Sequence, residues 1–146
     1  MIKIVFSLSR IDKELSEFEL GNMEIQIDKG IITSKNKIPD QNMMIFIAIS
    51  DMLDGIRIMI EQKRKEYLFI GADSSFKIIF RQNNNGVLIV NESREYKVSL
   101  HEFIRELQRE SNKFINDVAS QIDTEKGVMW DLLNSLHKFN RFVITN

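Results

Sequence analysis

The chain contains no cysteine, one proline and six glycines that never stand next to one another. Without thiols it forms neither a disulfide nor a thiolate, which excludes a disulfide-stapled secreted scaffold and fits a reducing cytoplasm. Isolated glycines exclude the glycine-rich loop that cradles phosphate groups in many nucleotide-binding proteins. We therefore expect stability to come from a hydrophobic core, and we expect no bound cofactor.

An excess of charge of one sign is also missing. Twenty basic and 21 acidic side chains leave a formal charge of −1, so no overall field attracts nucleic acid or an anionic membrane. No apolar run approaches the ~20 residues of a membrane span. The amino terminus alternates too regularly for a signal peptide. These absences predict a cytoplasmic protein without direct nucleic-acid or membrane binding.

The composition is that of a globular protein, with 43% hydrophobic and 28% charged residues. A chain of 146 residues suffices for one domain that buries roughly 70% of its unfolded surface. No repeat, low-complexity tract or linker interrupts it. We therefore predict a single domain spanning residues 1–146.

Alternating apolar and polar residues predict several antiparallel strands. Ile2 to Leu8 forms the first, and Met23 to Ile27 forms a hairpin with the IIT segment after a turn at Lys29-Gly30. Asparagine and glycine in two further turns tolerate the positive φ angles of tight hairpins. They separate the strands of a four-stranded meander, at about 67–70, 76–81, 87–90 and 95–98.

Apolar residues at helical spacing predict about three helices, which makes the fold class α+β. The first spans residues 40–64, after Pro39. Ser99-Leu100-His101-Glu102 is a capping box that opens the second. Asp123 or Thr124 caps the third. Met43, Ile47 and Ile58 interrupt the polar stripe of the first helix, so a loop, a second layer or a partner covers part of that side.

No catalytic or metal-binding pattern stands out. The histidines lie on different predicted helices, and neither has a metal-ligating partner four residues later. Ser74 and Ser75 lack the context of a nucleophile elbow. Asp51 and Asp54 lie one turn apart and could pair for acid-base chemistry, but neighbouring Arg57 and Glu61 favour a solvated stripe. We predict a protein that is not an enzyme.

The strongest local field lies between residues 11 and 28. Six acidic residues face a single Lys13, which gives a local charge of −5; they are Asp12, Glu14, Glu17, Glu19, Glu24 and Asp28. Such a cluster is either a solvated face or a surface that attracts a cationic partner.

Residues 47–115 resemble small cytoplasmic immunity proteins of bacterial polymorphic toxin systems, including those paired with LXG-type toxins. The matching elements are the SDMLDG helix segment, the FIGADSSF turn and the VSLHEFI helix opening. The resemblance implies a protein without enzymatic activity that binds one cognate toxin domain and blocks it by occlusion. The acidic segment suggests a nuclease as that toxin, because a nuclease has a basic surface for nucleic acid.

Two surfaces are candidates for the partner. The first is the acidic segment, with Asp12, Glu14, Glu17, Glu19 and Glu24. The second is an exposed patch at Ile47 and Ile58, rimmed by Asp51 and Asp54. Two other functions stay open: a structural homo-oligomer, such as a homodimer, and a small-ligand domain or enzyme built around Asp73. A toxin gene directly upstream would favour immunity.

Overall fold

The computed structural model describes residues 1–10, 14–28, 30–84, 86–125 and 127–145. The elements follow in the order β1 (Ile2–Leu8), β2 (Leu20–Ile27), β3 (Gly30–Thr33), β4 (Met43–Met44), α1 (Ile45–Glu61), β5 (Glu66–Ile70), β6 (Lys77–Asn83), β7 (Gly86–Asn91), β8 (Arg94–Ser99), α2 (Leu100–Val118), the short 3-10 helix η1 (Ala119–Gln121) and α3 (Gly127–Thr145).

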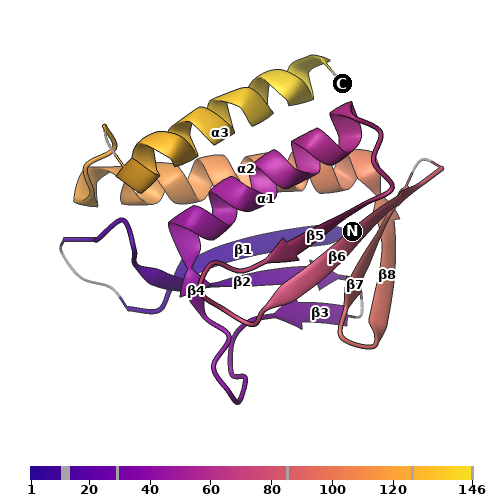
Figure 1. Cartoon of the computed structure of the whole chain (residues 1–146), viewed down its shortest axis with the longest axis horizontal. Helices are drawn as coiled ribbons and strands as arrows, with labels where there is room; N and C mark the ends of the chain where they lie inside the picture. Colours follow the sequence, from indigo (N-terminus) through magenta and orange to yellow (C-terminus); the bar gives the residue numbers. More distant parts are fainter. Residues whose placement is uncertain (11–13, 29, 85, 126, 146) are drawn as a thin grey trace.

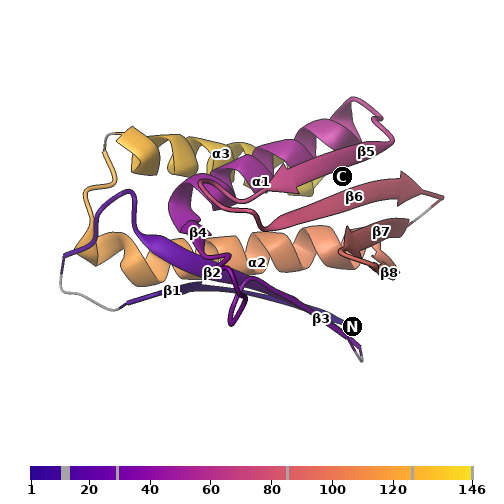
Figure 2. The same cartoon turned by 60° about the horizontal axis from the view of Figure 1, so that its bottom comes forward.

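The strands form two antiparallel sheets, which confirms the predicted α+β class. In the first, β2 lies between β1 and β3 and also pairs with β4; the second has the order β5-β6-β7-β8. Helices α1 and α3 lie side by side, and α2 runs along β1 (Figures 1 and 2). Both sheets and all three helices contribute side chains to one hydrophobic core.

The second sheet has one core face, as the alternation of its residues predicts. Ile78 and Phe80 of β6 are fully buried, whereas the intervening Ile79 is half-buried on the opposite face. The Phe80 ring packs against Phe103 of α2 with ring centroids 5.3 Å apart. Helix α2 begins where its capping serine predicts, because the Ser99 hydroxyl accepts a hydrogen bond from the Glu102 N–H at 3.3 Å.

The first helix begins later than its sequence predicts. Residues 40–44 lie outside α1, and Pro39 lies in the preceding connection rather than in the first turn. The reason is that Met43 and Met44 pair with β2 as the short strand β4, so their backbone groups belong to the sheet. A sheet contact between distant residues therefore overrides the local helical pattern.

Helix α3 covers the side of α1 on which apolar residues interrupt the polar stripe. The Ser135 hydroxyl of α3 donates to Asp54 at 3.0 Å and lies 2.9 Å from the Ser50 hydroxyl. Ile47 and Ile58 are half-buried. The prediction that these two residues form an exposed patch is therefore wrong, because a second layer of helix packs over this side.

Two carboxylates of α2 close the outer edge of β1. The N–H groups of Ile4 and Phe6 point away from β2 and donate to Glu106 and Glu110, each at 2.7 Å. The spacing matches, because four helical residues advance about 6 Å and two strand residues about 6.6 Å. An edge strand that would otherwise offer free donors to another chain is thereby blocked.

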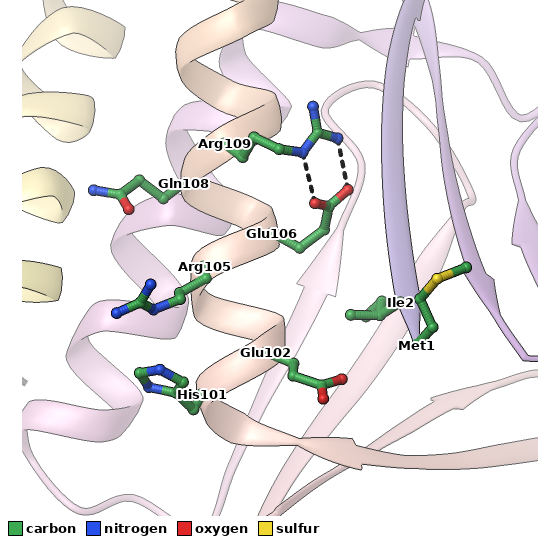
Figure 3. Close-up of a pocket in the computed structure, with 8 residues that line it drawn as sticks. All are labelled: Met1, Ile2, His101, Glu102, Arg105, Glu106, Gln108 and Arg109. Atoms are coloured by element: carbon green, nitrogen blue, oxygen red, sulfur yellow. Dashed lines mark hydrogen bonds and ion pairs between the residues drawn. The ribbon is translucent and has the colours of Figure 1, made fainter.

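The two carboxylates differ in their ionisation. Partial burial opposes ionisation of Glu106, but hydrogen bonds from Arg109 and from the Ile4 N–H outweigh it and lower its pKa. Arg109 holds Glu106 with two hydrogen bonds of 2.7 Å (Figure 3). Burial raises the pKa of Glu110, and the bond from the Phe6 N–H opposes this less strongly. Glu110 is therefore the costlier of the two to keep charged.

We expect Glu110→Ala to lower the free energy of unfolding by about 1–3 kcal/mol, because the buried Phe6 N–H loses its acceptor. Glu110→Gln keeps an acceptor and removes the buried charge. Because the folded pKa is raised, the contribution of Glu110 is largest below the ordinary glutamate pKa and is lost as the pH rises through the folded value. In urea titrations, the free energy of unfolding of Glu110→Gln should rise relative to that of wild type as the pH approaches neutrality. An equal loss of stability in Glu110→Ala and Glu110→Gln at every pH would contradict this explanation.

Gly55 of α1 lies directly beneath the ring of Tyr67, whose hydroxyl donates to the Asp51 carbonyl at 3.0 Å. A Cβ at position 55 would overlap the ring. Glycine to alanine inside a helix ordinarily stabilises by about 1 kcal/mol. Here we expect Gly55→Ala to destabilise by about 1–3 kcal/mol through overpacking. In a Tyr67→Ala background the same change should be neutral or stabilising, as thermal unfolding of the four variants would measure.

Candidate protein-binding surface

The acidic segment between β1 and β2 folds against the connection between α2 and α3. The Leu15 N–H donates to the Gln121 carbonyl at 3.0 Å, and the Leu15 side chain is buried in the core. The views in Figures 1 and 2 both place this segment beside the start of α3. Residues more than 100 positions apart thus share one end of the molecule.

Glu17 fastens the start of α3. Its Oε1 accepts the Val128 N–H at 3.3 Å, where a helix has free backbone donors and a partial positive charge. Gly127 has a φ of +64°, and a Cβ there would lie 2.5 Å from Glu17 Oε1. The helix therefore begins at Gly127, and the prediction that Asp123 or Thr124 caps it is wrong. Asp123 instead accepts the Glu125 N–H, in a turn before the helix.

Glu19 lies beneath this surface with 6% of its area exposed. Its carboxylate accepts the Ser16 N–H at 3.1 Å and the Arg10 Nε–H at 3.4 Å. The pKa of Glu19 is lowered, first by the Ser16 hydrogen bond and then by Arg10, against the opposing effect of burial. Its charge therefore holds the loop in shape and is not offered to a partner.

Large apolar side chains are exposed around these anchors. Phe18 is 53% exposed and Leu20 is 40% exposed, and both line a shallow groove of about 480 Å³ with Ser9, Arg10 and Ser16. Trp130, the only tryptophan of the chain, is 52% exposed one turn after Gly127. Residues three and four apart share a side of a helix. Trp130 therefore lies on the same side of α3 as exposed Asn134 and away from buried Met129 and Leu132.

Acidic side chains surround these apolar residues. The described residues 10, 14–19, 121–125 and 127–131 contain six acidic residues and one basic residue. We call this surface the acidic end and define it by Glu14, Glu17, Phe18, Leu20, Asp123, Glu125, Trp130 and Asp131. Except for half-buried Glu17, its carboxylates are exposed. A surface of this kind combines aromatic anchors with an acidic rim, which is a pattern found at protein interfaces.

Some residues of the acidic segment lie elsewhere. Glu24 is in the middle of β2, about 13 Å along the strand from Leu20, and its Oε1 accepts the Thr33 hydroxyl at 3.1 Å and lies 4.0 Å from Lys35 Nζ. Asp28 accepts the amino terminus at 2.9 Å. The sequence count of −5 therefore does not correspond to one surface.

Asp51 and Asp54 belong to α1. Asp51 lies at the surface, but neighbouring atoms partly shield its carboxyl from water. This shielding is the larger cause of its raised pKa, and the nearby charge of Asp54 is the smaller one. Asp54 faces α3, accepts Ser135 and lies 3.5 Å from Arg57. Asp12 lies outside the described residues. Of the seven predicted partner-binding residues, the structure thus places Glu14 and Glu17 at the acidic end.

Helix α3 contributes to this surface, which no pattern in the sequence predicted. Phe18 and Trp130 are 112 positions apart, so no local pattern joins them. One signal was available: Trp130 is a large aromatic residue beside Asp131, and it does not share the four-residue spacing of the apolar Val128, Leu132 and Leu136. Residues of that kind are candidates for exposed anchors.

A second groove, of about 600 Å³, lies between the start of β1 and α2. In Figure 3, Glu102 and Glu106 point toward Met1 and Ile2, whereas His101 and Arg105 project from the other side of the helix. His101 and His137 are exposed. Because Glu106 already binds Arg109 and the Ile4 N–H, its carboxylate serves the fold.

Within the described ranges, no cluster of three or more acidic or histidine side chains could hold a metal ion. In the same part of the chain, no helix combines the length and the apolar character needed to cross a membrane. Comparisons with protein-family models, with curated proteins and with solved structures found no match. The resemblance to immunity proteins therefore stays a prediction.

We expect Glu17→Ala to lower the free energy of unfolding by about 1 kcal/mol, because the first turn of α3 loses its carboxylate cap. Glu14→Ala is the matched control: Glu14 is exposed and no hydrogen bond involves it within the described residues, so stability should stay within about 0.5 kcal/mol. Chemical denaturation of both variants measures the difference. Equal stability of the two would show that the cap contributes nothing.

Proposed function

We propose that this protein is an immunity protein that binds a cognate bacterial toxin domain and blocks it, without catalysing a reaction. The observation that carries the proposal is the acidic end, where half-exposed Phe18 and Trp130 lie among carboxylates. Tryptophan is over-represented among residues that dominate binding energy at protein interfaces. The resemblance of residues 47–115 to immunity proteins supports the same reading.

The partner that fits this surface carries a basic face with apolar pockets. Carboxylates such as Glu14, Asp123 and Asp131 attract such a face over a distance and accelerate association at low salt. Nucleases that hold an anionic backbone have such a face. We therefore favour a nuclease toxin, neutralised in the bacterial cytoplasm by one-to-one occlusion of its active site.

The anchoring of the acidic end favours tight binding. The Leu15 N–H donates to the Gln121 carbonyl and the Val128 N–H donates to the Glu17 carboxylate, so the loop is fastened to the start of α3. Buried Glu19 fixes the turn at Ser16 within the loop. A surface that is already ordered loses little conformational entropy when a partner binds. The same anchors join the segment that carries Phe18 to the helix that carries Trp130, which contributes to the choice of one partner over others.

The test uses the toxin domain encoded beside the gene for this protein. We expect a one-to-one complex by isothermal titration calorimetry and loss of toxin activity at equal concentrations. Trp130→Ala should weaken binding by about 30-fold, as for a residue at the centre of an interface. Ile144→Ala is the matched control, because Ile144 is an apolar residue of α3 that is 82% exposed in its last turn. Equal effects of both substitutions would refute the assignment of the acidic end.

The charge component has its own test. Glu14→Gln combined with Asp131→Asn should slow association at low salt and have little effect at high salt, because exposed charges are screened. Glu92→Gln, in the turn between β7 and β8, serves as the control. Stopped-flow measurement of the association rate distinguishes them. If the association rates of wild type, the double variant and Glu92→Gln were all independent of salt, electrostatic attraction by this surface would be excluded.

A further inference from the structure

The edges of the two sheets are protected to different degrees. Carboxylates from α2 occupy the free N–H groups of β1. Helix α1 lies along β5, where the Tyr67 hydroxyl donates to Asp51 and the Met44 N–H donates to Ala72 just after the strand. Strand β3 has four residues. Strand β8 has six residues and adjoins β7 on one side.

The hydrogen-bonding register shows which groups of β8 point outward. A two-residue turn joins Asn91 to Arg94. The backbone N–H and C=O groups of this pair, and of every second pair after it, therefore form the hydrogen bonds between β7 and β8. The backbone groups of Glu95, Lys97 and Ser99 therefore point away from β7. Among the described residues, no group outside β7 forms a hydrogen bond with residues 95–98. A paired strand would satisfy these outward groups.

The surroundings of β8 leave room for such a strand. Arg94, Glu95 and Lys97 are exposed, and even the core-side residues Tyr96 and Val98 are only half-buried. On its core side β8 meets the first sheet, because the Tyr96 ring packs on Gly30 of β3, and a groove of about 730 Å³ lies between residues 94–97 and Ile27, Asp28 and Gly30. The edge that is blocked at β1 is therefore accessible at β8.

The charges of β8 are complementary to themselves. When two copies of this strand pair antiparallel with Tyr96 opposite Tyr96, Glu95 of each copy lies opposite Lys97 of the other. Both residues have outward backbone groups, so each Glu95–Lys97 pair is also a hydrogen-bonded pair. Registers centred on Glu95 or on Lys97 would instead place like charges opposite each other, which is unfavourable.

We propose that a second copy of this chain pairs with β8 to form a symmetric dimer in which the two four-stranded sheets become one continuous sheet. The contact is isologous, so it closes at two copies and does not propagate. This inference is independent of the proposed immunity function, because β8 is separate from the residues that define the acidic end. Failure of either proposal leaves the other unaffected.

Charge exchange tests the dimer. Sedimentation of the full chain should give twice the monomer mass of 17.1 kDa. Lys97→Glu should raise the dimer dissociation constant by about tenfold, because two attractive pairs become repulsive. The double variant Glu95→Lys with Lys97→Glu restores both pairs and should restore the dimer. Ile31→Lys, on the edge strand β3, should leave it unchanged. A monomer at every concentration, or a double variant no better than Lys97→Glu, overturns the proposal.

The absence of cysteine from the chain allows a test of the register. In the proposed dimer, positions 95 and 97 of different copies lie about 5.5 Å apart between Cα atoms, within the range of a disulfide. Mild oxidation of a mixture of Glu95→Cys and Lys97→Cys proteins should give a cross-linked dimer of one copy of each. Each protein alone should cross-link far less. Efficient cross-linking of either protein alone, without the mixed product, overturns the proposed pairing.

Discussion

The pairing of α2 carboxylates with the backbone of β1 is the interaction on which the arrangement of the two layers depends. Glu106 and Glu110 are spaced by one helical turn, and the N–H groups that they accept are spaced by two strand residues. This match fixes the position of α2 along the strand. It also brings two carboxylates to the boundary of the core. Arg109 and the backbone N–H donors offset the cost of desolvating them.

That interaction also divides the sheet edges into closed and open ones. Hydrogen bonds to a helix make β1 unavailable to another chain, whereas within the described residues no group outside β7 binds the backbone of residues 95–98 in β8. The same physical group, an unpaired strand backbone, is thus satisfied inside the chain at one edge and is available for association at another. Charges on the acidic end follow a similar division, because Glu17 and Glu19 serve the fold and Glu14 faces solvent.

Local pattern was a sufficient guide where neighbouring residues decide the structure. The alternation in β1, the hairpins of the meander and the serine cap of α2 each depend on a few neighbouring residues, and the structure has all of them. The pattern misled where a distant segment competes. Met43 and Met44 have helical neighbours but pair with β2, and the start of α3 is capped by Glu17 from a loop 110 positions earlier.

The sequence by itself determined the α+β class, the hairpins and the core faces of strands and helices, because periodicity and turn chemistry are properties of short segments. Only the tertiary structure decided which charges share a surface. It separated Glu24 and Asp28 from Glu14 and joined Glu17 to the start of α3. The physical reason has two parts. Residues close in sequence are carried apart when they lie along an extended strand, and hydrogen bonds between distant segments bring together residues that are remote in sequence.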